Sequence, residues 1–315
     1  MATLRKFVPP VEFHPGITLD EKLKEMGMGV KEFAIRTSKP AKTIFAVING
    51  KSNVTSDMAV AFESVTKIPA HFWLNIQSGY DEYIARKKKE KQLMSEYEWA
   101  RSFPLKKMME YGWITSSKSE EETVKSLLSF FQVSSSKGWE DYYLHQQLKV
   151  AFRLSLSTTK EPHAISAWLR QGEIQAAEIE SVKFSEKTLR EAIPDIKLLC
   201  VEHPANFANA LQKKCAKAGV KLVYTPRLPK APISGSTRWI NNTPCIQMTD
   251  RYKGNDAFWF TFFHELGHIL LHGKKDIFLE DIEYGDKQKE KENEADAFSS
   301  RILRQICFNT SQKSC

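Results

Sequence analysis

The chain has 315 residues and a formal net charge of +8, and 42% of its residues are hydrophobic and 27% are charged. It is too long for one small domain, and its length predicts two or three domains with buried cores. No apolar run is long enough to span a membrane, and residues 1–13 lack the apolar core of a signal peptide. We therefore expect a cytoplasmic protein with no membrane partner, and the positive charge favours nucleic acid as an anionic partner.

Five cysteines are scattered along the chain without a CxxC pair, at Cys200, Cys215, Cys245, Cys307 and Cys315. An odd number of unevenly spaced cysteines in a chain without a signal peptide is typical of reduced thiols. A zinc site built from these cysteines is therefore not expected.

Short helical segments follow one another between residues 15 and 91, and they predict an all-α domain preceded by an N-terminal arm at residues 1–14. The expected helices cover residues 20–26, 30–37, 40–49, 55–65 and a fifth segment that starts near residue 69. Gly27 and Gly50 would end the first and third helices, and Pro40 suits the first turn of the third. The basic run at residues 86–91 is taken as the end of the domain.

The second and third of these helices fit a helix-turn-helix of the phage-repressor type, in which the third would be the recognition helix. Four residues form the predicted DNA-binding surface: Lys39, Lys42, Thr43 and Lys51. The three lysines are placed for phosphates, and Thr43 is the expected base reader. One recognition helix reads few base pairs, so we expect a homodimer on a palindromic operator. The alternative is a helical bundle that makes only protein contacts.

Residues 92–195 also predict mainly helices, and we interpret them as a helical connector because they contain no catalytic constellation. From residue 196 to 315 the pattern changes to that of an α+β domain. A helix at residues 205–218 precedes three short strands at 220–225, 236–240 and 245–249. Two further helices are expected at residues 257–271 and 290–303.

The helix at residues 257–271 carries an HExxH motif formed by His264, Glu265 and His268. Residues four apart on a helix differ by about 40° around its axis, so both imidazoles leave one face and can hold one Zn²⁺ ion. Glu265 lies beside that face and can act as general base towards a zinc-activated water. The alternative is that the two histidines are polar residues of a core helix, but leaving them buried and unpaired would be costly.

A third ligand is expected on the last helix, where Glu292 and Asp296 share one face. Glu292 can bind the metal while Asp296 orients a histidine from behind. Glu294 points elsewhere and is the rival ligand. We expect His272 to interact with the carboxyl end of its helix and not to be a ligand.

Two segments of the chain resemble known families. Residues 14–80, with Phe33-Ala34, Ile48–Lys51 and Phe72–Gln77, closely resemble HigA-type antitoxins with an Xre-like helix-turn-helix. Residues 251–298, with Phe260–His268 and Glu294–Phe298, resemble the ImmA/IrrE metallopeptidases. The resemblance implies a bacterial regulator with a zincin-like domain and places the zinc ligands at His264, His268 and Glu292.

After Leu303 the sequence departs from the pattern of these metallopeptidases, and we expect a C-terminus that is truncated or diverged. Two functions then follow as hypotheses. The first is a DNA-binding regulator whose zinc-dependent peptidase domain cleaves a specific protein. The alternative is a HigA-like antitoxin or autorepressor with a cognate toxin as partner, whose zinc domain is sensory or structural and not proteolytic.

Overall fold

The computed structural model describes residues 13–146, 161–231, 233–249, 254–273, 278–279 and 286–311. The chain divides into two compact units, Met1–Gln92 and Leu93–Cys315. Of the predicted N-terminal arm, only residues 13 and 14 lie among the described residues. Among those residues, no helix is both long and apolar enough to cross a membrane.

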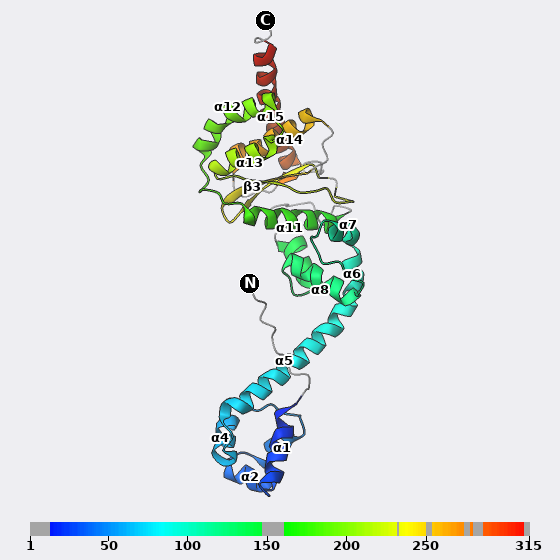
Figure 1. Cartoon of the computed structure of the whole chain (residues 1–315), viewed down its shortest axis with the longest axis vertical. Helices are drawn as coiled ribbons and strands as arrows, with labels where there is room; N and C mark the ends of the chain where they lie inside the picture. Colours follow the sequence, from blue (N-terminus) through cyan, green and yellow to red (C-terminus); the bar gives the residue numbers. More distant parts are fainter. Residues whose placement is uncertain are drawn as a thin grey trace. The chain divides into compact units, whose positions relative to one another are not determined.

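Helices build the first unit, and all of them lie close to their predicted positions (Figure 1). They are α1 (Pro15–Glu25), α2 (Val30–Arg36), α3 (Ala41–Ile48), α4 (Ser56–Thr66) and α5 (Ala70–Ser95). Helix α1 begins five residues earlier than predicted. The reason is a cap at His14, whose Nδ1 accepts a hydrogen bond from the Gly16 N–H at 3.0 Å, with proline at the first helical position.

Three aromatic side chains tie the helices of the first unit together. Phe33 of α2, Phe62 of α4 and Trp73 of α5 are fully buried. The ring centroids of Phe33 and Phe62 lie 5.1 Å apart, and those of Phe62 and Trp73 lie 5.7 Å apart. Such contacts add to the free energy gained by burying the rings. They fix α2 and α3 on a packed support, with Ile44 and Val47 of α3 turned into the same core.

The second unit starts with a helical segment that packs into the rest of that unit. Its elements are α6 (Tyr97–Arg101), α7 (Leu105–Glu110), α8 (Glu120–Phe131), α9 (Ser136–Trp139), the π-helix η1 (Glu140–Gln146), α11 (Pro162–Glu178) and α12 (Glu186–Glu202). Trp139 and Trp168 are buried in the core of this segment. Helix α12 runs across residues 195/196, where the sequence places a domain boundary, and the residues on both sides belong to the second compact unit.

A mixed sheet in the order β1-β3-β2-β4 forms the centre of the second unit. The strands are β1 (Lys221–Tyr224), β2 (Gly235–Ile240), β3 (Thr243–Met248) and β4 (Phe278–Leu279), and β4 was not predicted. Strand β1 runs parallel to β3, whereas β2 is antiparallel to both β3 and β4. The all-α N-terminal unit and the α+β C-terminal fold confirm the predicted fold class.

Helices cover both faces of this sheet. Helix α11 lies on one face, and α12, α13 (Phe207–Lys217), α14 (Asn255–Leu271) and α15 (Asp286–Ser311) lie on the other (Figure 1). Buried polar side chains tie α11 to the sheet: Gln247 donates to the Trp168 carbonyl at 2.7 Å, and Arg238 donates to the Leu169 carbonyl. Because these groups are buried, losing one partner would leave the other unsatisfied at a cost of about 1–3 kcal/mol. The predicted connector is thus part of the platform that carries α14.

Candidate functional site

Helix α14 is held between the sheet and helix α15 by side chains that bond its backbone. The Thr237 hydroxyl of β2 donates to the Glu265 carbonyl at 2.9 Å, and the Ser299 hydroxyl of α15 donates to the Phe260 carbonyl at 2.8 Å. Phe262, Phe263 and Leu266 of α14 are fully buried. A helix anchored from two sides gives the polar groups of its HExxH motif fixed positions.

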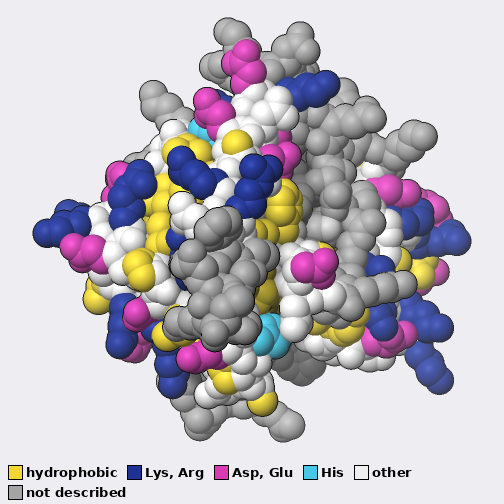
Figure 2. Space-filling view, turned by 90° about the horizontal axis from the view of Figure 1, so that it is seen from above, with side chains coloured by type: hydrophobic (Ala, Val, Ile, Leu, Met, Phe, Trp, Pro, Cys, Tyr) yellow, Lys and Arg dark blue, Asp and Glu magenta, His cyan; other side chains and the backbone are white. Residues whose placement is uncertain are grey.

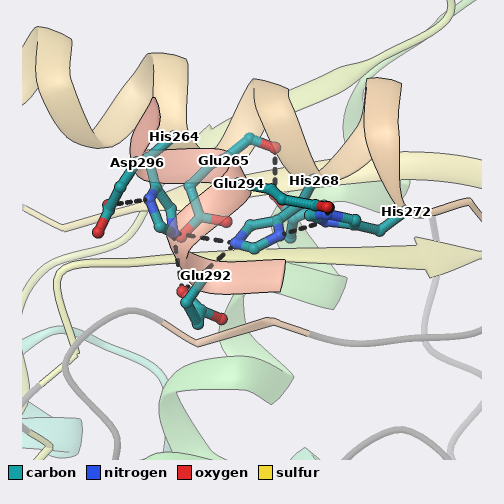
Figure 3. Close-up of polar contacts among 8 residues, drawn as sticks. His264, Glu265, His268, His272, Glu292, Glu294 and Asp296 are labelled. Atoms are coloured by element: carbon teal, nitrogen blue, oxygen red, sulfur yellow. Dashed lines mark hydrogen bonds and ion pairs between the residues drawn. The ribbon is translucent and has the colours of Figure 1, made fainter. Parts of the chain in front are cut away.

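The two histidines of the motif meet a carboxylate from α15. Both rings project from one face of α14 towards Glu292 (Figure 3). The Nε2 atoms of His264 and His268 lie 2.9 Å apart. Glu292 Oε2 lies 3.0 Å from Nε2 of His264 and 3.6 Å from Nε2 of His268. Among the described residues, these three side chains form the one group whose ligand atoms could hold a metal ion.

The triangle of donor atoms fits a tetrahedral metal ion. Zinc–nitrogen and zinc–oxygen bonds of about 2.0–2.1 Å place neighbouring ligands of a tetrahedral site about 3.3 Å apart. The three distances, 2.9, 3.0 and 3.6 Å, scatter around that value. Two imidazoles and one carboxylate are also the donor set of catalytic zinc sites, which leave the fourth position open. The residues present therefore fit Zn²⁺.

The protonation states of these groups suit a cation. Burial lowers the pKa of His268 to about 4, so the ring is neutral at pH 7. Burial alone would raise the pKa of Glu292, but hydrogen bonds with His264 and His268 outweigh it and hold that pKa at about 2. A neutral imidazole and an ionised carboxylate are the forms that bind a metal.

Behind His264, the carboxylate of Asp296 lies at hydrogen-bond distance from the ring atom that faces away from the donor triangle. His264 Nδ1 is 2.8 Å from Asp296 Oδ1. If Nε2 binds a metal, Nδ1 carries the proton and donates it to the aspartate. The structure thus brings Asp296 to the position where the sequence predicts an orienting carboxylate.

A second pair of side chains lies behind His268, and sequence reasoning missed it. His268 Nδ1 is 3.0 Å from Nδ1 of His272, and His272 Nε2 is 2.8 Å from Glu294 Oε2 (Figure 3). His272 does end helix α14, as expected, but its ring turns towards His268 and away from solvent. A signal was present in the sequence, because His272 follows His268 by the same four-residue spacing that joins His268 to His264.

Glu265 is completely buried beside strand β2, where a glycine leaves room for it. A Cβ atom on Gly235 would lie 2.6 Å from Oε1 of Glu265 and 2.8 Å from the Thr261 methyl group. A second glycine, Gly267, lets α15 approach, since a Cβ there would lie 3.2 Å from the Phe298 ring. Both contacts depend on tertiary packing, and the local sequence contains no signal for them.

The predicted DNA-binding residues lie on and beside α3. Lys42 and Lys51 are exposed, and Thr43 is partly buried. Lys39 differs from them because its side chain is only 19% exposed and forms an ion pair with Asp57 of α4. Sequence reasoning did not select Phe45, whose side chain is 44% exposed on α3, one helical turn after Lys42.

The positive charge of the chain is unevenly distributed. Residues 1–91 hold 15 lysines and arginines against 10 acidic residues. On the face shown in Figure 2, basic and acidic side chains are interspersed, and neither sign dominates the described surface. Residues 1–91 therefore contribute a net charge of +5 to the +8 of the whole chain.

Comparison with known families and structures connects both units to described proteins. Residues 215–303 match the model of the IrrE N-terminal-like domain of Peptidase M78, which spans the sheet, α14 and most of α15. No curated protein is similar enough to the chain to match it.

Solved structures similar to the chain are HigA-type antitoxins, and they cover its N-terminal part. An addiction module antidote protein of the HigA family from Coxiella burnetii is 31% identical, over 27% of this chain and 94% of that chain, with a TM-score of 0.26. The antitoxin HigA of Pseudomonas aeruginosa, solved with the higBA promoter, is 29% identical over 27% of this chain and 95% of that chain, with a TM-score of 0.26. Another solved structure from Pseudomonas aeruginosa, of a protein in complex with its 28-bp operator DNA, is 29% identical over 27% of this chain and 96% of that chain, with a TM-score of 0.26.

Proposed function

Since this chain joins a domain of the HigA antitoxin family to an IrrE-like domain of Peptidase M78, we propose that it is a DNA-binding transcriptional regulator that cleaves one specific protein with a zinc-dependent peptidase site. The observation that carries the proposal is the convergence of His264, His268 and Glu292 on one point, with Glu265 beside it (Figure 3). We place the protein in the cytoplasm, as a homodimer on operator DNA.

Each residue of the site has a separate role in the proposed peptide hydrolysis. Bound by His264, His268 and Glu292, Zn²⁺ would supply Lewis-acid chemistry that polarises a carbonyl and makes water a stronger nucleophile at neutral pH. Glu265 takes the proton of the attacking water as general base and holds it at its carboxylate. Gly235 leaves the space that this carboxylate occupies, and Asp296 holds the ring of His264 in place.

The N-terminal unit supplies the DNA contact in this proposal. Lys42 and Lys51 bind phosphates, while Thr43 and the exposed ring of Phe45 meet base edges in the major groove. Lys39 also contacts phosphate, once its side chain leaves Asp57. The proteins solved with promoter and operator DNA support this assignment, because they align with this part of the chain at 29% identity.

One observation favours the second candidate function, a HigA-like antitoxin or autorepressor whose zinc domain is sensory or structural. His264, Glu265 and His268 are exposed by only 3%, 0% and 1%. A site this well covered suits a metal that holds α14 and α15 together. In that case the protein partner is a cognate toxin that is bound and not cleaved.

The experiment that tests the proposal compares cells that express the wild-type chain with cells that express Glu265→Gln. Mass spectrometry of protein N-termini should find one new cleavage product in the wild-type cells and none in the variant. Both proteins should bind the same promoter DNA in a gel shift and contain the same zinc. Promoter binding and zinc with no wild-type-specific N-terminus would establish the antitoxin function. Failure to bind promoter DNA would contradict the regulator function.

A further inference from the structure

His268 uses both of its ring nitrogens, and the one that faces away from the donor triangle leads to two more side chains. Its Nδ1 lies 3.0 Å from Nδ1 of His272, and Nε2 of His272 lies 2.8 Å from Oε2 of Glu294. The His268 side chain is fully buried, and that of His272 is 3% exposed. The three groups form a line that runs from the donor triangle to the surface of α15, where the Glu294 side chain is 64% exposed (Figure 3).

The positions of the protons along this line follow from the metal site. A ring nitrogen that binds a metal carries no proton, so a neutral His268 that binds through Nε2 has its proton on Nδ1. That N–H can donate only if Nδ1 of His272 accepts. His272 then carries its own proton on Nε2 and donates to the Glu294 carboxylate. This single arrangement of neutral rings and an ionised glutamate satisfies both contacts.

We propose that His272 and Glu294 are positioning residues that fix the ring and the tautomer of His268 for metal binding, as Asp296 does directly for His264. The proposal rests on the metal site of the proposed function. Helix α15 would then supply three carboxylates with three tasks. Glu292 binds the metal, Asp296 orients the first histidine, and Glu294 orients the second through His272.

The position of His272 explains how Glu294 can act on His268 without contacting it. His268 is in the last turn of α14, and His272 is the residue that ends this helix. Glu294 comes from α15 and is exposed, so the ring of His272 spans the distance between it and the buried histidine.

Chelator competition on the full-length protein tests the proposal, with zinc as the probe. The variants are Glu294→Ala, His272→Leu, the double variant, and Glu290→Ala as a control that removes an exposed acidic residue of the same helix. Losing a partner that orients a metal-binding histidine typically lowers metal affinity about 10–100-fold. We expect a loss in this range for His272→Leu and a loss towards its lower end for Glu294→Ala. Glu290→Ala should bind zinc as the wild type does.

The double variant separates positioning from a general effect of charge. If Glu294 acts through His272, adding Glu294→Ala to His272→Leu changes zinc affinity by less than about two-fold. If the Glu294 charge instead attracted the metal directly through space, Glu294→Ala would lower zinc affinity by the same factor in the wild type and in His272→Leu. That result would overturn the proposal. Glu294→Gln should recover most of the lost affinity, because its amide oxygen still accepts the proton of His272.

Thermal melting of the metal-free proteins tests whether Glu294→Ala weakens the fold itself and not only zinc binding. Without zinc, the midpoint for Glu294→Ala should equal that of the wild type. With zinc it should fall below the wild-type midpoint, because stabilisation by a bound metal rises with the logarithm of its affinity. Wild-type affinity in both Glu294→Ala and His272→Leu would overturn the positioning role while leaving the metal site intact. A wild-type chain that binds no zinc would instead overturn the proposed function itself.

Discussion

Lys42, Phe45 and Lys51 are exposed around α3, whereas His264, Glu265 and His268 are buried in α14. The three exposed side chains of this first set would act only through contacts with bound DNA. In the second set, His264 already contacts Asp296 and His268 already contacts His272. The Glu265 carboxylate occupies the space left by the missing side chain of Gly235. A buried site of this kind should respond to single substitutions with large, salt-insensitive effects. An exposed surface should respond with small effects that add up and depend on salt.

Glu265→Gln is the substitution with the largest expected effect. Removing a general base typically slows a reaction about 10²–10⁴-fold, and glutamine keeps the size of the side chain. Zinc content should be unchanged, because Glu265 is not one of the three donors. The measurement is the rate at which the cleaved partner accumulates in cells, with zinc determined in parallel. Loss of zinc from this variant would mean that Glu265 has been assigned the wrong role.

Glu292→Ala should lower zinc affinity by more than roughly 100-fold, beyond the range seen for residues that only orient a ligand. The reason is that Glu292 Oε2 lies within 3.0–3.6 Å of both histidine nitrogens. Competition with a chelator at two salt concentrations measures the loss, which should be the same at both. A larger loss for Glu294→Ala than for Glu292→Ala would transfer the ligand role to Glu294.

Gly235→Ala should destabilise the second unit and slow cleavage while zinc is retained. The new methyl group would lie 2.6 Å from the Glu265 carboxylate, and overpacking of this kind costs about 1–3 kcal/mol. Urea unfolding gives the change in stability. The control is Gly79→Ala in α5, where a Cβ meets no atom within 4 Å. Equal stability of Gly235→Ala and the wild type would show that Glu265 does not lie against β2.

Lys42→Ala and Lys51→Ala should each weaken binding to promoter DNA and to a scrambled duplex alike. Each should also reduce the slope of log affinity against log salt by about 1, because one phosphate contact is lost. Lys39→Ala should have a smaller effect, since its side chain first has to leave Asp57. Gel shifts at several salt concentrations measure all three variants. Unchanged slopes for Lys42 and Lys51 would place the DNA on another surface.

Base reading should produce the smallest effects. Thr43→Ala should relax sequence preference more than it lowers affinity. If Phe45 covers a thymine methyl, replacing thymine by uracil throughout the promoter duplex should weaken wild-type binding about four-fold per lost contact. Phe45→Ala should then bind both duplexes equally. A wild-type protein that does not distinguish the two duplexes would exclude this contact.

The sequence predicted those features that depend on regular spacing within one helix. His264 and His268 share a face because they lie four residues apart, and Glu292 and Asp296 do so for the same reason. The helices of the first unit followed from proline, glycine and capping residues. Helix α1 began earlier than predicted because its cap is a histidine, which is not among the usual capping residues.

Features that join distant parts of the chain could not be predicted in this way. The pairing of Lys39 with Asp57 spans 18 residues, and the contact of His272 with Glu294 spans 22. Gly235 matters only because strand β2 passes beside α14, and no local pattern specifies that approach. Helix α11 lies in the segment interpreted as a connector, and it packs on the sheet through Arg238 and Gln247, which lie in strands far along the chain.

The most direct test of the account is the zinc content of the full-length protein, purified without chelators and measured by plasma mass spectrometry. The wild type should contain one zinc per chain, and the variant with His264→Ala and His268→Ala should contain none. The variant should still bind promoter DNA, because its N-terminal unit is unchanged. A wild type that is metal-free and takes up no added zinc, or a double variant that keeps its zinc, would contradict the assignment of the metal site.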